Sequence, residues 1–240
     1  MKIGDKDFPY SFSQNRLYND CPRKYKYRYV YGIKEPINDN LVLGSAIHKV
    51  FELAHKKYNV LEDVEIAEAL FSITKLKGDL YRQKLLDEFL VLNHAKPEYN
   101  LGRELEIKRD DFISVIDLVH NYAAQSHKYT LADYKVTKNP KNESSIYDEG
   151  QLLIYKYLWC IEHPDIDPKD VWVQYINILP YLSSKVITVT EPHMVSFETC
   201  ENLFKQVQAT KQKILEGEFP KKKKWCRWCF YKDKCDHDCE

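Results

Sequence analysis

The sequence predicts an α/β protein in which a mixed sheet is flanked by helices. In the second half of the chain, short apolar segments rich in β-branched residues alternate with segments of helical periodicity. With 240 residues, 44% of them hydrophobic and 30% charged, the chain can bury a large core without disulfides. No internal repeat or low-complexity linker divides it. We therefore expect one domain spanning residues 1–240.

The first hundred residues read as helical. A helix follows Ser11, and between residues 43 and 58 apolar side chains recur at helical spacing while His48, Glu52 and His55 occupy another face. The pattern of residues 61–94 predicts at least two amphipathic helices with a break near Gly78, and Pro97 ends this helical region. We interpret residues 60–104 as a helical insert.

The elements expected after this insert alternate between strand and helix. Two strands, residues 112–119 and 129–136, are expected to pair with each other. The following elements are a helix at 149–161, strands at 171–179 and 185–190, and a helix at 196–216 that ends before Gly217. Residues 23–31 alternate with period two, which fits a strand, but a helix continuing from Ser13 fits equally well.

Composition predicts where the protein is located, but it does not identify a binding partner. Lys plus Arg and Asp plus Glu each total 36, so a nucleic-acid partner cannot be inferred from the net charge. No stretch approaches the length of a membrane span, and residues 1–5 lack the apolar segment of a secretory signal. We expect a cytoplasmic protein with no membrane association.

Two strand ends carry acidic residues that can act together. Asp133 and Lys135 lie two apart, late in one expected strand, so their side chains share a face. Asp117 is expected to end the neighbouring strand. If the strands pair, the two carboxylates converge and form a hard-oxygen site for magnesium or manganese.

Further polar residues complete an ordered series. His48 stands one turn into its helix after Gly44, and Gln151 and Tyr155 share one face of another helix. The series G-x-x-x-H, apolar-x-x-D, D-Y-K and Q-x-x-x-Y resembles the RecB-type branch of the PD-(D/E)XK nucleases. The resemblance implies a restriction-endonuclease-like mixed sheet. Ser114 and Ile116 depart from the glycine and proline usual before the first acid.

The resemblance also implies roles for these residues. It makes Asp117, Asp133 and Lys135 catalytic, and it assigns Gln151 and Tyr155 to the DNA backbone. The implied ligands of the Mg or Mn ion are His48, Asp117, Asp133 and the backbone carbonyl of Tyr134.

The spacing of the cysteines narrows the resemblance to one subset of the family. Cys226, Cys229 and Cys235 follow the spacing C-x2-C-x5-C, and Cys21 stands in a Cys-Pro-Arg-Lys-Tyr context. This is similar to the iron-sulfur subset of the family, which includes the AddB nuclease domain and the Cas-type nuclease of CRISPR adaptation. It implies a structural [4Fe-4S] cluster that joins the tail, residues 220–240, to Cys21.

A zinc site is the alternative for this tail. Cys226, Cys229, Cys235 and Cys239 could hold zinc without Cys21, and spacing alone does not separate the two. The remaining cysteines, Cys160 and Cys200, read as buried small hydrophobes.

Two basic runs are candidates for contact with DNA. Arg23, Lys24, Lys26 and Arg28 alternate with tyrosines, and no acid occurs between residues 23 and 34. Residues 221–224 are four consecutive lysines.

These observations predict a metal-dependent DNA exonuclease acting on single-stranded DNA or on DNA ends. The alternative is a non-catalytic DNA-binding or assembly protein with a zinc-stabilised tail.

Overall fold

The computed structural model of the chain describes residues 9–56, 64–94, 100–121, 128–220, 222 and 226–235. The chain divides into two compact units. Unit 1 comprises Met1–Pro36, Ile107–Ser114 and Glu201–Glu240, and unit 2 comprises Ile37–Glu106 and Val115–Cys200. Most of the sheet and its flanking helices belong to unit 2, whereas both ends of the chain belong to unit 1.

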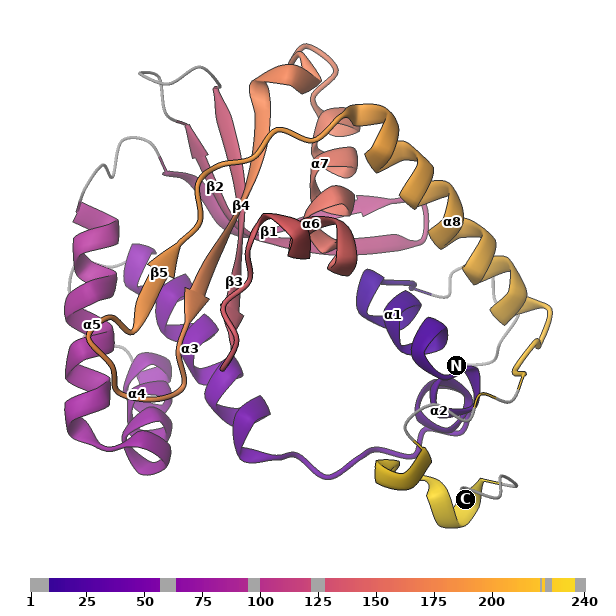
Figure 1. The fold of residues 1–240 in the computed structure, drawn as a ribbon, viewed down its shortest axis with the longest axis horizontal. Helices are drawn as coiled ribbons and strands as arrows, with labels where there is room; N and C mark the ends of the chain where they lie inside the picture. Colours follow the sequence, from indigo (N-terminus) through magenta and orange to yellow (C-terminus); the bar gives the residue numbers. More distant parts are fainter. Residues whose placement is uncertain are drawn as a thin grey trace. The chain divides into compact units, whose positions relative to one another are not determined.

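Five strands form one sheet in the order β1-β2-β3-β4-β5 (Figure 1). Their bounds are β1 Asn100–Arg109, β2 Phe112–Asn121, β3 Tyr129–Val136, β4 Val171–Ile178 and β5 Ile187–Val189. β2 pairs with β3 in antiparallel orientation, β3 with β4 in parallel, and β4 with β5 in antiparallel. The sheet is therefore mixed, as the sequence predicts.

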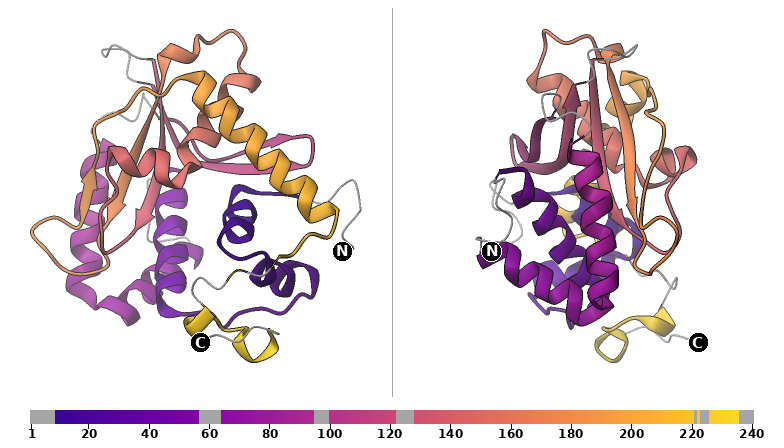
Figure 2. Two further views of the ribbon diagram at one scale, coloured as in Figure 1. Left: turned by 45° about the vertical axis from the view of Figure 1, so that its right-hand side comes forward. Right: turned by 90° about the vertical axis from the view of Figure 1, so that its left-hand side faces the viewer.

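In unit 2, three helices form a layer against one face of the sheet. They are α3 (Asp39–Lys56), α4 (Val64–Lys77) and α5 (Asp79–His94), and Figure 2 shows them side by side. Their apolar side chains join Ala132 and Tyr134 of β3 in one core, where the rings of Phe51 and Phe89 stack 3.9 Å apart. This burial fixes the orientation of α3, the helix that carries His48.

The opposite face of β3 meets α7 (Gln151–Glu162). Because side chains alternate along a strand, Asp133 and Lys135 point toward α7 while Ala132 and Tyr134 enter the core on the other side. α7 follows α6 (Glu143–Glu149) through Gly150, whose φ of 73° is a left-handed conformation that glycine adopts without strain. This turn starts α7 at Gln151.

Unit 1 contains the helices at the two ends of the chain. These are α1 (Phe12–Asp20), α2 (Pro22–Tyr25), a π-helical turn at Lys26–Val30, most of α8 (Phe197–Leu215) and short 3-10 turns at Cys226–Trp228 and Lys232–Lys234. Residues 23–31 are thus helical rather than a strand. Across the described segments, no helix combines the length and apolar character needed to traverse a bilayer.

Most expected elements are present, but some boundaries were wrong. Residues 100–104, expected at the end of the helical insert, begin β1, and α6 was not anticipated. Asp117 lies inside β2 rather than at its end. The break at Gly78 between α4 and α5 is confirmed, with φ of 84°, whereas Pro97 lies outside the described residues.

Candidate active site

Asp117 and Asp133 are brought together by the pairing of β2 with β3. Leu118 lies opposite Ala132; Asp117 precedes Leu118 and Asp133 follows Ala132, so the two aspartates lie at the next position of the antiparallel pair. The backbone N–H of Tyr134 donates to Asp117 Oδ2 over 2.7 Å. Asp117 is 6% exposed and Asp133 1% exposed, so both carboxylates are removed from water.

Burial makes the ionised forms of this pair costly. It raises the pKa of Asp117 to about 8, with the Asp133 charge as the second cause, against smaller lowering effects of His48 and the Tyr134 N–H. Burial also raises the pKa of Asp133, although Lys135 opposes that shift. Two adjacent carboxylates that resist ionisation together provide a favourable environment for a cation.

A ring of polar contacts joins β3 to α7 beside this pair. Lys135 Nζ lies 2.8 Å from Asp133 Oδ2 and donates over 2.8 Å to Gln151 Oε1. Gln151 Nε2 donates to the Tyr155 hydroxyl over 2.7 Å, and that hydroxyl donates to Asp133 Oδ1 over 3.4 Å. The ring holds the Lys135 ammonium in place, and it uses the Gln151–Tyr155 spacing predicted from the sequence.

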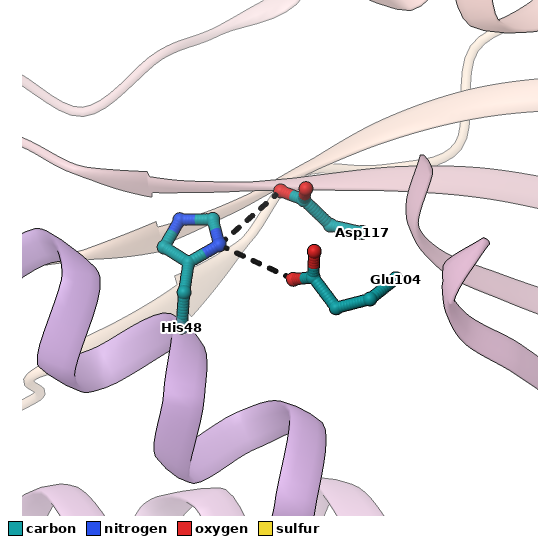
Figure 3. Close-up of side chains that lie close together, drawn as sticks. All are labelled: His48, Glu104 and Asp117. Atoms are coloured by element: carbon teal, nitrogen blue, oxygen red, sulfur yellow. Dashed lines mark ion pairs between the residues drawn. The ribbon is translucent and has the colours of Figure 1, made fainter. Parts of the chain in front are cut away.

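His48 approaches the pair from α3 (Figure 3). Its Nδ1 lies 3.9 Å from Asp117 Oδ2 and 3.5 Å from Glu104 Oε1 of β1. Burial alone would lower the pKa of His48. The negative charges of Glu104 and Asp117 favour the protonated imidazole, and their effect exceeds that of burial, so the pKa is raised. In the described part of the chain, His48, Glu104 and Asp117 are the group whose donor atoms all lie within 4.8 Å of one another.

The structure therefore gathers the acidic residues, the lysine, the histidine and the Gln-Tyr pair that the sequence singled out. Glu104 is the residue that the sequence interpretation missed. No local pattern marked it, because β1 itself was not expected and Glu104 was assigned to the helical insert.

The donor atoms fit a divalent cation of the hard to borderline type. Carboxylate oxygens suit magnesium and manganese, and one imidazole nitrogen is acceptable to manganese. Glu104 Oε1 is buried with a long contact of 3.5 Å to His48 Nδ1, and Asp133 Oδ2 has the Lys135 ammonium as its partner. Such carboxylate oxygens are what a cation would stabilise.

The other predicted residues lie in unit 1. Part of the positive charge of the basic run is paired with an acid that the sequence interpretation did not consider. Glu35, just beyond the run, lies 3.0 Å from Lys24 and 4.0 Å from Arg28. Tyr25 is fully buried, and Tyr27 stacks on Tyr231 at 5.3 Å. The lysine run at 221–224 lies outside the described residues, except for Lys222.

The two ends of the chain meet within unit 1. The Tyr18 hydroxyl donates to the carbonyl of Glu218 over 2.6 Å, and the Tyr231 hydroxyl donates to the carbonyl of Ile33 over 2.6 Å. Cys21 caps the end of α1 in this region. Burial raises the pKa of Cys229, Lys24 lowers it and Cys21 raises it, so Cys21 lies within electrostatic reach of the Cys229 thiol.

The remaining cysteines divide as expected. Cys160 and Cys200 are buried, and burial raises the pKa of Cys160 to about 11 and that of Cys200 to about 12. Their thiols are therefore inert core groups. Cys239 lies outside the described residues.

Comparison with protein families decides the classification. The family model described as the PD-(D/E)XK nuclease superfamily matches residues 9–236. The chain belongs to this superfamily. The match spans nearly the whole sequence, so it includes the sheet, the acidic residues, Cys21 and the C-x2-C-x5-C cysteines, but not Cys239. A search of curated proteins gives no match.

One solved structure supports the fold. A candidate exonuclease from Eubacterium rectale is similar with a TM-score of 0.58 at 9% identity, covering 98% of this chain and 90% of that one. The protein SSO0001 aligns at 15% identity over 97% of this chain and 87% of its own, with a TM-score of 0.41. At such identities the first likeness concerns the fold alone.

The buried pair predicts how the metal-free protein responds to pH. Since the folded-state pKa of Asp117 is raised, its contribution to stability is present below its ordinary pKa and is lost as pH rises from about 4 to about 8. Asp117→Asn keeps an oxygen for the Tyr134 N–H and removes the charge. We expect thermal melts in chelator to show a Tm gain over the parent that grows across this range.

The control for this prediction is Asp87→Asn, the same change at an exposed position of α5. It should leave the Tm unchanged at each pH. A Tm difference for Asp117→Asn that does not vary with pH would mean that Asp117 is not the titrating group.

Proposed function

We propose that this protein is a metal-dependent deoxyribonuclease, and more narrowly an exonuclease acting on single-stranded DNA or DNA ends. The observation that carries the proposal is the convergence of buried Asp117 and Asp133 with Lys135 and His48 in a chain of this nuclease superfamily. An acidic cation site beside a fixed ammonium is what phosphodiester hydrolysis requires. Membership of the superfamily by itself supports a nuclease.

The cation would be Mg or Mn, held by His48, Asp117, Asp133 and the backbone carbonyl of Tyr134. Such an ion would lower the pKa of a nearby water and would neutralise negative charge on the phosphate. The protein would contribute the carboxylates of Asp117 and Asp133, whose charge is poorly solvated because both are buried.

Lys135 would stabilise the negative charge that develops on the phosphate during hydrolysis. Its ammonium is held by Asp133 on one side and by Gln151 on the other, so it needs no reorganisation when a phosphate oxygen becomes more negative. Tyr155 keeps Gln151 oriented and contacts Asp133. Gln151 and Tyr155 thereby hold Lys135, and we also assign them to the DNA backbone.

Further DNA contacts are assigned to unit 1. Arg23, Lys24, Lys26 and Arg28 provide positive charge, of which Glu35 compensates a part. Tyr31 is 56% exposed, and the Lys26 ammonium lies 5.2 Å from its ring centre. An exposed ring beside cationic side chains suits a stacked base and its phosphate, as in single-strand binding.

A structural [4Fe-4S] cluster on Cys21, Cys226, Cys229 and Cys235 is also part of the proposal. The contacts between the chain ends support a ligand set drawn from both.

The test is a nuclease assay on purified protein with end-labelled linear single strands and with circular single-stranded DNA. Since circles offer no ends, we expect Mn²⁺ or Mg²⁺ to permit stepwise degradation of the linear strand only. A chelator should stop it. Cleavage of circles would contradict the exonuclease assignment, and DNA binding without cleavage in any metal would identify the non-catalytic alternative.

A further inference from the structure

We infer that Glu104 is an additional ligand of the divalent cation, so that a carboxylate from β1 joins the His48 imidazole and the carboxylates of Asp117 and Asp133. The inference rests on the proposed function and deepens it. Glu104 belongs to none of the four motifs on which the resemblance is based.

The distances suit a shared ion. Donor atoms around one octahedral Mg²⁺ or Mn²⁺ lie about 3 Å apart when adjacent and about 4.2 Å when opposite, given metal–oxygen bonds near 2.1 Å. His48 Nδ1 lies 3.5 Å from Glu104 Oε1 and 3.9 Å from Asp117 Oδ2. All three groups come from different elements and point toward one another in Figure 3.

Glu104 has a weak set of partners for a structural residue. Its Oε1 is buried, and its contact with His48 Nδ1 is a long one of 3.5 Å. Asp133 differs, because Lys135 and Tyr155 already contact its two oxygens. Glu104 would therefore exchange a long contact, the one with His48, for a bond to the cation that both residues share.

Hydrogen bonds of the neighbouring residue fix the position of Glu104 beside His48. The neighbouring side chain, Arg103, is buried and donates from Nη1 over 3.0 Å to both the carbonyl of Phe51 and the hydroxyl of Tyr134. β1 is thereby tied to the helix that carries His48 and to the strand that carries Asp133. Glu104 itself has φ of 48°, an uncommon value for a residue with a side chain.

The experiment measures Mn²⁺ affinity by the electron paramagnetic resonance of free Mn²⁺, with DNA absent, alongside degradation of linear single strands. Glu104→Gln keeps the shape and removes the negative oxygen, so we expect the Kd for Mn²⁺ to rise by about 10-fold or more. Glu106→Gln, an identical change at an exposed position of the same strand, should leave the Kd unchanged.

A second variant covers the case in which Glu104→Gln is misfolded. Glu104→His replaces an oxygen ligand with a nitrogen ligand, so its Kd for Co²⁺ should fall relative to its Kd for Mn²⁺. A role in packing alone would not change this ratio. The ratio therefore reports ligation independently of activity.

The outcomes separate this inference from the proposed function. If the parent binds Mn²⁺ and degrades DNA while Glu104→Gln has the parental Kd, or Glu104→His the parental Co²⁺ to Mn²⁺ ratio, then Glu104 is not a ligand and the proposed function stands. A parent that neither binds Mn²⁺ nor degrades DNA overturns both.

Discussion

Lys135→Met is expected to lower the rate of DNA hydrolysis by about 10³-fold, the size of effect seen when one preorganised donor to developing charge is removed. The ammonium of Lys135 is fixed between Asp133 and Gln151, 2.8 Å from each. Methionine preserves the hydrocarbon stem but offers no charge. Single-turnover cleavage at saturating DNA and Mn²⁺ measures the chemical step, and the Kd for DNA should change little.

The control is Lys75→Met, an identical substitution at an exposed position of α4. Removing Lys135 also leaves the buried Asp133 without its cation, which destabilises a protein by about 3–5 kcal/mol in comparable cases. The double variant Asp133→Asn/Lys135→Met removes both charges, so it should regain the parental Tm and stay inactive. Cleavage by either variant within about tenfold of the parental rate would exclude Lys135 from the reaction.

Much of the site could be predicted because its residues follow strict local patterns. Asp133 and Lys135 lie two apart on a strand, and Gln151 and Tyr155 lie four apart on a helix, so each pair shares a face whatever the rest of the fold does. The convergence of Asp117 with Asp133 required only that two adjacent strands pair in antiparallel orientation.

The rest depended on contacts that the local sequence does not encode. Residues 100–104 mix polar and apolar types, and their strand conformation is supported by tertiary contacts such as the two that Arg103 donates. For that reason Glu104 could not be placed beside His48. Glu35 was likewise overlooked, because its pairing with Lys24 arises where the chain folds back after the π-helical turn.

Cys21→Ser is expected to remove the iron and visible colour of the anaerobically purified protein and to lower its Tm by about 10 °C or more. Cys21 and Cys226 are separated by about 200 residues, and closing a loop of that size stabilises a folded protein by about 5 kcal/mol on the chain-entropy model. For a chain of this length, each kcal/mol shifts Tm by about 2–4 °C.

Cys239→Ser is the matched control, and it separates the two metal sites. With a cluster on Cys21, Cys226, Cys229 and Cys235, this variant should keep its iron, colour and Tm. A local zinc site would reverse the pattern, because Cys239 would then be essential for metal content and Cys21 dispensable. Iron and zinc analysis of the parent and both variants measures this directly. Retained iron in Cys21→Ser would contradict the cluster that joins the chain ends, since without Cys21 the amino-terminal segment contributes no thiolate.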